Sequence, residues 1–136
     1  MGCDIHVSVE IKHKGKWLHY SQPSMPRDYQ MFALMANVRN SGDHTPISEA
    51  KGLPEDITDA TKVIYSYDEA DAHSESWLSS EEFTKLIKTY LKKQRNDISF
   101  EHDYFGYLFG GVWEIEWKDE WPEGLEDYRI IFWFDN

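Results

Sequence analysis

The strongest constraint on the fold is the alternating stretch DIHVSVEI at residues 4–11. Apolar and polar side chains take turns there, which is typical of a half-buried β-strand with one face toward the core. The polar side chains are those of Asp4, His6, Ser8 and Glu10. Because carboxylates, an imidazole and a hydroxyl on one face can bind ligands, the pattern predicts both a strand and a candidate site.

Two antiparallel hairpins are predicted, one at each end of the chain. The strand at residues 3–12 turns at a Lys-Gly pair and returns at residues 16–20. Near the other end, alternating apolar residues predict strands at 111–118 and 128–134, joined by a turn that contains proline and glycine. Four strands are therefore expected to form one antiparallel sheet.

Two helices are predicted from apolar residues at helical spacing. The first covers residues 29–39 and has Asp28 as its N-cap. The second covers residues 80–93, where Ser79 and Glu82 have the spacing of a capping box. Both helices have an apolar stripe that must pack on the sheet.

The order of these elements predicts an α+β fold: an antiparallel sheet of about four to five strands with two helices packed on one face. The length of 136 residues predicts a single domain over residues 1–136. Between the helices, a long loop is expected at residues 43–61 and a short strand at 61–67. Residues 71–77 are expected to form the loop that enters the second helix.

Charge and cysteine content restrict the function classes. The formal net charge of −11 argues against broad nucleic-acid binding, which needs a basic surface. Cys3 is the single cysteine, so no internal disulfide can form and a reducing compartment is expected. No apolar run approaches the ~20 residues that span a bilayer, and no signal peptide precedes the folded part. We therefore expect a cytoplasmic protein with no membrane or direct nucleic-acid partner, and a homo-oligomer is compatible with the sequence.

A second polar stretch, DAHSES, repeats the Asp-x-His spacing of the first strand. It places Asp71 and His73 two residues apart, as Asp4 and His6 are. If this segment folds over the first strand, the two pairs supply two imidazoles and two carboxylates. Such a nitrogen and oxygen set suits a divalent metal such as zinc or manganese. The sequence thus predicts a shared pocket, and a metal site is one form that it can take.

The predicted ligand site also includes neighbours of these pairs. Ser74, Ser76 and Trp77 lie just before a helix N-terminus, where backbone N–H groups favour anions. Lys51, in the middle loop, is expected to supply a positive rim. In a plainer interpretation, the polar face of the strand is only solvated, Asp71 caps a turn, and Ser74 and Ser76 bond the backbone.

Several strings together resemble a family of small proteins encoded by bacteriophages and prophages: MGCDIH, RDYQMFALMANVRN, PISEAKGLPED, DAHSESWL and FWFDN. The resemblance covers nearly the whole chain and implies an intracellular setting in an infected or lysogenic bacterium. It brings no activity with it. Lys51 stands where the family often has arginine, which keeps the charge but loses the bidentate fork.

Three function classes compete. The first is a protein that binds a small, nucleotide-like ligand in the Asp/His-lined pocket and so counters a host defence signal. The second is a metal-dependent hydrolase of a phosphoester-type ligand. The third is an acidic inhibitor that covers a basic surface of a host nucleic-acid-binding protein. We favour the first, because a hydrolase should show a clearer base and nucleophile pair and an inhibitor needs no Asp-x-His pairs.

Overall fold

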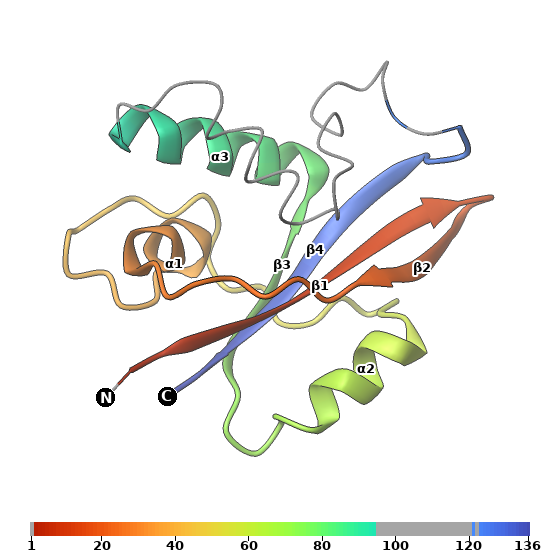
Figure 1. The fold of residues 1–136 in the computed structure, drawn as a ribbon, viewed down its shortest axis with the longest axis horizontal. Helices are drawn as coiled ribbons and strands as arrows, with labels where there is room; N and C mark the ends of the chain where they lie inside the picture. The colour runs from red at the N-terminus through yellow and green to blue at the C-terminus, as the bar shows by residue number, and fades with distance from the viewer. Residues whose placement is uncertain (1, 95–120, 122) are drawn as a thin grey trace.

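The computed structural model describes residues 2–94, 121 and 123–136 (Figure 1). Four strands and three helices lie in this part of the chain. In chain order they are β1 (Asp4–His13), β2 (Lys16–Ser21), α1 (Tyr29–Ala36), α2 (Asp59–Ser66), β3 (His73–Ser79), α3 (Ser80–Gln94) and β4 (Asp127–Asp135). The strand predicted at 111–118 lies outside the described residues. None of the described helices is long and apolar enough to cross a membrane.

The four strands form one antiparallel sheet in the order β2-β1-β4-β3. The last strand, β4, pairs with the first along most of its length, from Asp4 opposite Asp135 to Lys12 opposite Asp127. The α+β fold with an antiparallel sheet is confirmed. Pairing of β1 with β4 brings both ends of the described chain to one end of the sheet (Figure 1).

The two faces of the sheet are covered differently. The apolar side chains of β1 and every second residue of β4 form one buried cluster with α1 and α3. A smaller cluster on the opposite face joins Tyr65 of α2 to Ile131 and Trp133 of β4. Figure 1 shows α2 on the other side of the sheet from α1 and α3. The polar face of β1 therefore lies under α2 and the segments that flank it.

Two segments between the helices differ from the sequence-based prediction. Residues 61–67, predicted as a strand, lie mostly in α2, which begins after the N-cap Thr58. Thr61 and Tyr65 are four residues apart and are both buried against the sheet. This packing outweighs the strand propensity of the β-branched side chains in the segment.

The second difference concerns residues 71–77, which were predicted as a loop. They contain most of edge strand β3, which pairs with β4 and carries an irregularity between His73 and Ser76. Ser74 has a positive φ of 56° at this irregularity. Polar residues around a bulge hide the alternation of Ser76 and Leu78, which are both buried.

Both predicted helix starts are confirmed. The Asp28 side chain accepts a hydrogen bond from the backbone N–H of Met31 at 3.1 Å. In the capping box, the N–H of Glu82 donates to Ser79 Oγ at 3.2 Å, and the N–H of Ser79 donates to Glu82 Oε1 at 3.0 Å. These bonds satisfy N–H groups that lack partners within the helix.

Replacing Ser79 by alanine should lower the free energy of unfolding by about 1 kcal/mol, because the N–H of Glu82 loses its acceptor. Urea denaturation followed by circular dichroism measures the change. Ser66→Ala is the matched control, since this exposed hydroxyl donates only to the carbonyl of Val63. An equal loss of stability in both variants would show that the capping box stabilises the protein no more than the hydrogen bond of an exposed serine does.

Candidate functional site

An open pocket of about 370 Å³ lies along the N-terminal half of β1. Strand β2 pairs with β1 only from Val9 onward, so the edge of the first half of β1 faces the segment that joins β2 to α1. We call this hollow the β1 pocket. Its lining residues are Asp4, Ile5, His6, Val7, Gln22, Pro23, Ser24, Met25, Ile64 and Trp133.

His6 is the most chemically versatile residue of the β1 pocket. Its Nε2 lies 2.5 Å from Oδ2 of Asp135, which is two residues along β4 from the cross-strand partner of His6, and its Nδ1 lies 3.6 Å from Oδ2 of Asp68. The ring stacks on Trp133 at a centroid distance of 6.2 Å. The His6 side chain is 37% exposed, so a ligand can reach it.

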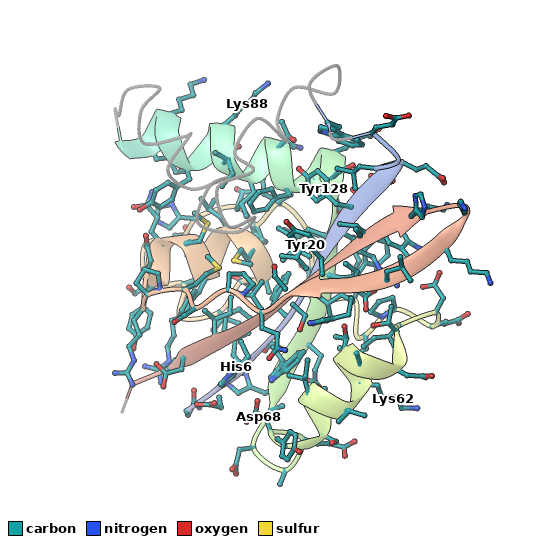
Figure 2. All side chains as sticks on the ribbon, turned by 45° about the vertical axis from the view of Figure 1, so that its right-hand side comes forward. His6, Tyr20, Lys62, Asp68, Lys88 and Tyr128 are labelled. Carbon is teal, nitrogen blue, oxygen red and sulfur yellow. The ribbon has the colours of Figure 1, made fainter. Side chains whose placement is uncertain are left out.

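Asp68 is held in place by its own turn and by the sheet. It lies just beyond the end of α2, and its carbonyl accepts the N–H groups of Asp71 and Ala72, each at 2.9 Å. Its Oδ2 accepts a hydrogen bond from Nε1 of Trp133 at 3.1 Å. Figure 2 shows His6 and Asp68 at the same end of the sheet, close to α2. The carboxylate is therefore directed toward His6 by a buried donor.

Asp4, which lines the β1 pocket, is paired with a cation. Arg27 donates from Nε to Asp4 Oδ1 at 2.6 Å and from a terminal nitrogen to Oδ2 at 3.2 Å. These hydrogen bonds hold the pKa of Asp4 below its usual value. The guanidinium also lies over Gly2, where a Cβ would come within 2.1 Å of it. Arg27 thus gives the otherwise acidic site one positive group.

A separate polar network is buried farther along β1. Arg129 donates to Glu10 Oε1 at 2.9 and 2.7 Å and to Asp56 Oδ1 at 2.7 Å. The other oxygen of Glu10 accepts bonds from the hydroxyls of Thr58 and Thr61 at 2.5 and 2.7 Å. The pKa of Asp56 is lowered by its hydrogen bond from Arg129. Because its charges are paired and its centre is closed to solvent, this network fixes the start of α2 on the sheet.

Three residues predicted for the ligand site lie together at β3, which is separated from β1 by β4. They are Lys51, Ser76 and Trp77. Lys51 Nζ lies 2.5 Å from Glu82 Oε1 and 4.0 Å from the centroid of the Trp77 ring. The backbone N–H of Lys51 donates to the buried Ser76 Oγ at 3.0 Å. These contacts tie the middle loop to β3 and α3. The prediction that Lys51 forms the rim of the His6 pocket is wrong.

The prediction that His6 and His73 share a pocket is also wrong. His73 pairs with Phe134, which pairs with Ile5, whereas His6 pairs with Trp133. Partners in antiparallel strands point to the same face, so the two histidines lie on opposite faces of the sheet. His73 contacts Asn136 Oδ1 at 3.2 Å through Nε2, and Ser74 Oγ at 3.0 Å through Nδ1.

The metal set predicted from Asp4, His6, Asp71 and His73 is therefore not assembled. Asp71 is exposed, and the carboxylates beside His6 are those of Asp135 and of Asp68, three residues before Asp71. Among the described residues, the group compact enough to surround one ion is His6, Asp68 and Asp135, with ligand atoms within 4.8 Å of one another.

Sequence reasoning missed both carboxylates that flank His6. Asp135 lies in the closing FWFDN string, and its position follows only from the register of β4 against β1. Asp68 follows a segment that was predicted as a strand, so its place at the end of a helix was not apparent.

No protein-family model, curated protein or solved structure matches the chain.

Proposed function

We propose that the protein binds a small, nucleotide-like ligand in the β1 pocket. The observation that carries this proposal is the pocket itself: about 370 Å³ beside the part of the β1 edge that β2 does not cover, with polar and apolar groups on its walls. Small-molecule sites commonly enclose about 300–1,000 Å³ and combine apolar walls with a few polar groups. The β1 pocket fits the lower part of that range.

The walls suit a planar, polar ring. Met25 and Ile64 supply partly exposed apolar surface, and the amide of Gln22 and the hydroxyl of Ser24 can each donate and accept hydrogen bonds. A nucleobase presents donors and acceptors at its edge and an apolar face, so it can use both kinds of wall. Arg27 donates to Asp4 of the pocket wall, so a phosphate bound by this guanidinium would share it with the Asp4 carboxylate.

Binding is favoured over a hydrolysis with His6 as general base by the surroundings of this residue. A hydrolase that uses His6 as a base needs a nucleophile within hydrogen-bond reach of the imidazole. Both ring nitrogens of His6 face carboxylates instead, Asp135 on one side and Asp68 on the other. In the phage setting that the sequence resemblance implies, a protein of this kind would sequester a nucleotide-type signal of the host.

Nucleotides and cyclic nucleotides should raise the melting temperature of the protein, because a ligand that binds only the folded state stabilises it by mass action. Differential scanning fluorimetry with nucleotides, free sugars and polyamines, followed by equilibrium dialysis, tests the ligand class. The double variant Gln22→Ala/Ser24→Ala should weaken binding about tenfold or more, since two hydrogen bonds are lost.

Lys88→Ala is the control for this experiment, because Lys88 lies on α3, away from the β1 pocket (Figure 2). This variant should bind like the unmodified protein. Shifts produced by polyamines but not by nucleotides, or equal losses in the control and the pocket variant, would contradict the proposal.

A further inference from the structure

We infer that His6 and Asp68 hold a divalent metal ion between them, and that Asp135 positions the imidazole for this task. The metal site does not depend on the identity of the ligand. A role of the ion in holding the ligand's anionic group rests on the proposed function.

The contact between His6 and Asp135 indicates which ring nitrogen of His6 carries a proton. Its Nε2 lies 2.5 Å from the Asp135 carboxylate, which can only accept a hydrogen bond, so Nε2 carries a proton. In the neutral imidazole, Nδ1 then has a lone pair. Nδ1 and Oδ2 of Asp68 lie 3.6 Å apart, a distance too long for a hydrogen bond. When Nδ1 has a lone pair, a cation between these two atoms is attracted by both of them.

The distance between Nδ1 of His6 and Oδ2 of Asp68 suits a metal ion between them. Nitrogen and carboxylate ligands lie about 2.0–2.2 Å from Zn²⁺, which places neighbouring ligand atoms about 3.0–3.5 Å apart. The distance of 3.6 Å between Nδ1 of His6 and Oδ2 of Asp68 is close to that separation. A metal ion therefore fits with only a small movement of either side chain.

Each of the two ligand side chains is held by a further hydrogen bond to the sheet. Metal-binding histidines usually donate their other N–H to a carboxylate, and metal-binding carboxylates are themselves hydrogen-bonded. His6 has Asp135 in the first role, and Asp68 accepts from Nε1 of the fully buried Trp133 at 3.1 Å. Trp133 also stacks on the His6 ring. Both ligand side chains are thus oriented by groups of the folded sheet.

The ligand set indicates which ions to expect. One imidazole nitrogen with one carboxylate suits Zn²⁺ or Mn²⁺ better than Ca²⁺, which prefers oxygen ligands alone. Two protein ligands leave several coordination positions open, and His6 also lines the β1 pocket. An anionic group of the ligand can occupy such a position, where the ion offsets the negative charge of Asp68 and Asp135.

The test is titration of metal-free protein, purified without a nickel column, with ZnCl₂ and with MnCl₂ in an isothermal titration calorimeter. The unmodified chain should bind one equivalent of at least one of these ions. His6→Ala and Asp68→Asn should each weaken that binding by about 100-fold or more, because each removes a ligand. Asp135→Asn should weaken it by about 10–100-fold, as expected for a residue that acts through His6.

Asp71→Asn is the matched control, because it removes the same charge from an exposed position in the same turn. It should leave metal affinity unchanged, and circular dichroism confirms that every variant is folded. The inference is overturned by the absence of saturable binding of both ions. Unchanged affinity in Asp68→Asn would overturn it as well.

The outcomes separate this inference from the proposed function. Stoichiometric metal binding without any nucleotide binding supports the metal site and contradicts the proposed ligand. Nucleotide binding that is equally tight with and without the ion overturns the role assigned to the metal in holding the ligand. A loss of metal affinity in Asp135→Asn as large as that in Asp68→Asn overturns the positioning role of Asp135.

Discussion

Replacing Arg129 by methionine should lower the free energy of unfolding by about 3–5 kcal/mol, because Glu10 would remain in the interior as a charge without its partner. Arg129 is 4% exposed and Glu10 is 0% exposed, so water cannot replace the lost guanidinium. The substitution also frees Asp56, which Arg129 holds at 2.7 Å. The start of α2 should therefore loosen with the ion pair.

Urea denaturation with far-ultraviolet circular dichroism measures this loss. The matched control is Arg27→Met, which breaks the exposed ion pair with Asp4 and should change stability far less, because water and salt screen such pairs. The double variant Glu10→Met/Arg129→Met should be more stable than Arg129→Met alone, because no unpaired charge remains inside. Equal losses of stability in Arg129→Met and Arg27→Met would contradict the expectation that an unpaired, buried Glu10 destabilises the fold.

Much of the sheet could be predicted because it depends on local patterns. The alternation at residues 4–11 places apolar side chains on one face of β1, and the structure buries Ile5, Val7 and Val9 in the main core. The helix starts at Asp28 and Ser79 were also predictable, because a capping side chain bonds to a backbone group only three residues away.

The elements between the helices could not be predicted in the same way. Helix α2 is short and its segment is rich in β-branched residues, so local propensity favours a strand. Tertiary contacts stabilise the helix instead. Thr61 donates a hydrogen bond to Glu10. Tyr65 packs on Trp133 and donates a hydrogen bond to Glu75. The hydrogen bond to Glu75 raises the pKa of Tyr65 to about 12.

The candidate site depends on register, which local patterns do not give. A shift of one residue in strand pairing moves a side chain to the other face of a sheet. His73 pairs with Phe134 rather than with Trp133, so it lies across the sheet from His6 although both belong to Asp-x-His pairs. The same register puts Asp135 beside His6, 129 residues away in the chain.

The four polar side chains on the α2 face of β1 differ in how far they are buried. Asp4 and His6 line the open pocket, whereas Ser8 and Glu10 are fully buried. The covered half of the face anchors α2 through Glu10, and the open half leaves His6 accessible. Because Asp68 follows α2, the anchoring of that helix also sets the position of the carboxylate opposite His6.

Trp133 connects the stability of the α2 face with the candidate metal site, and two substitutions separate these roles. Trp133→Ala should lower the free energy of unfolding by about 3–5 kcal/mol, because the fully buried ring leaves a cavity beside Tyr65. Trp133→Phe keeps an aromatic ring in place and should cost less. It removes the N–H that directs Asp68, so metal affinity should fall by about 10–100-fold while the fold persists.

Phe132→Leu is the matched control for Trp133→Phe, because Phe132 is the neighbouring residue of β4, is equally buried, and belongs to the core on the other face. It should lower stability through lost packing and leave the affinity for Zn²⁺ or Mn²⁺ unchanged, as measured by calorimetry on the folded variants. The decisive comparison is the ratio of the two effects. If Phe132→Leu weakens metal binding as much as Trp133→Phe does, the ion responds to general loosening of the sheet. A selective loss in Trp133→Phe instead shows that the indole acts on the site directly, through its hydrogen bond to Asp68 and its stacking on His6.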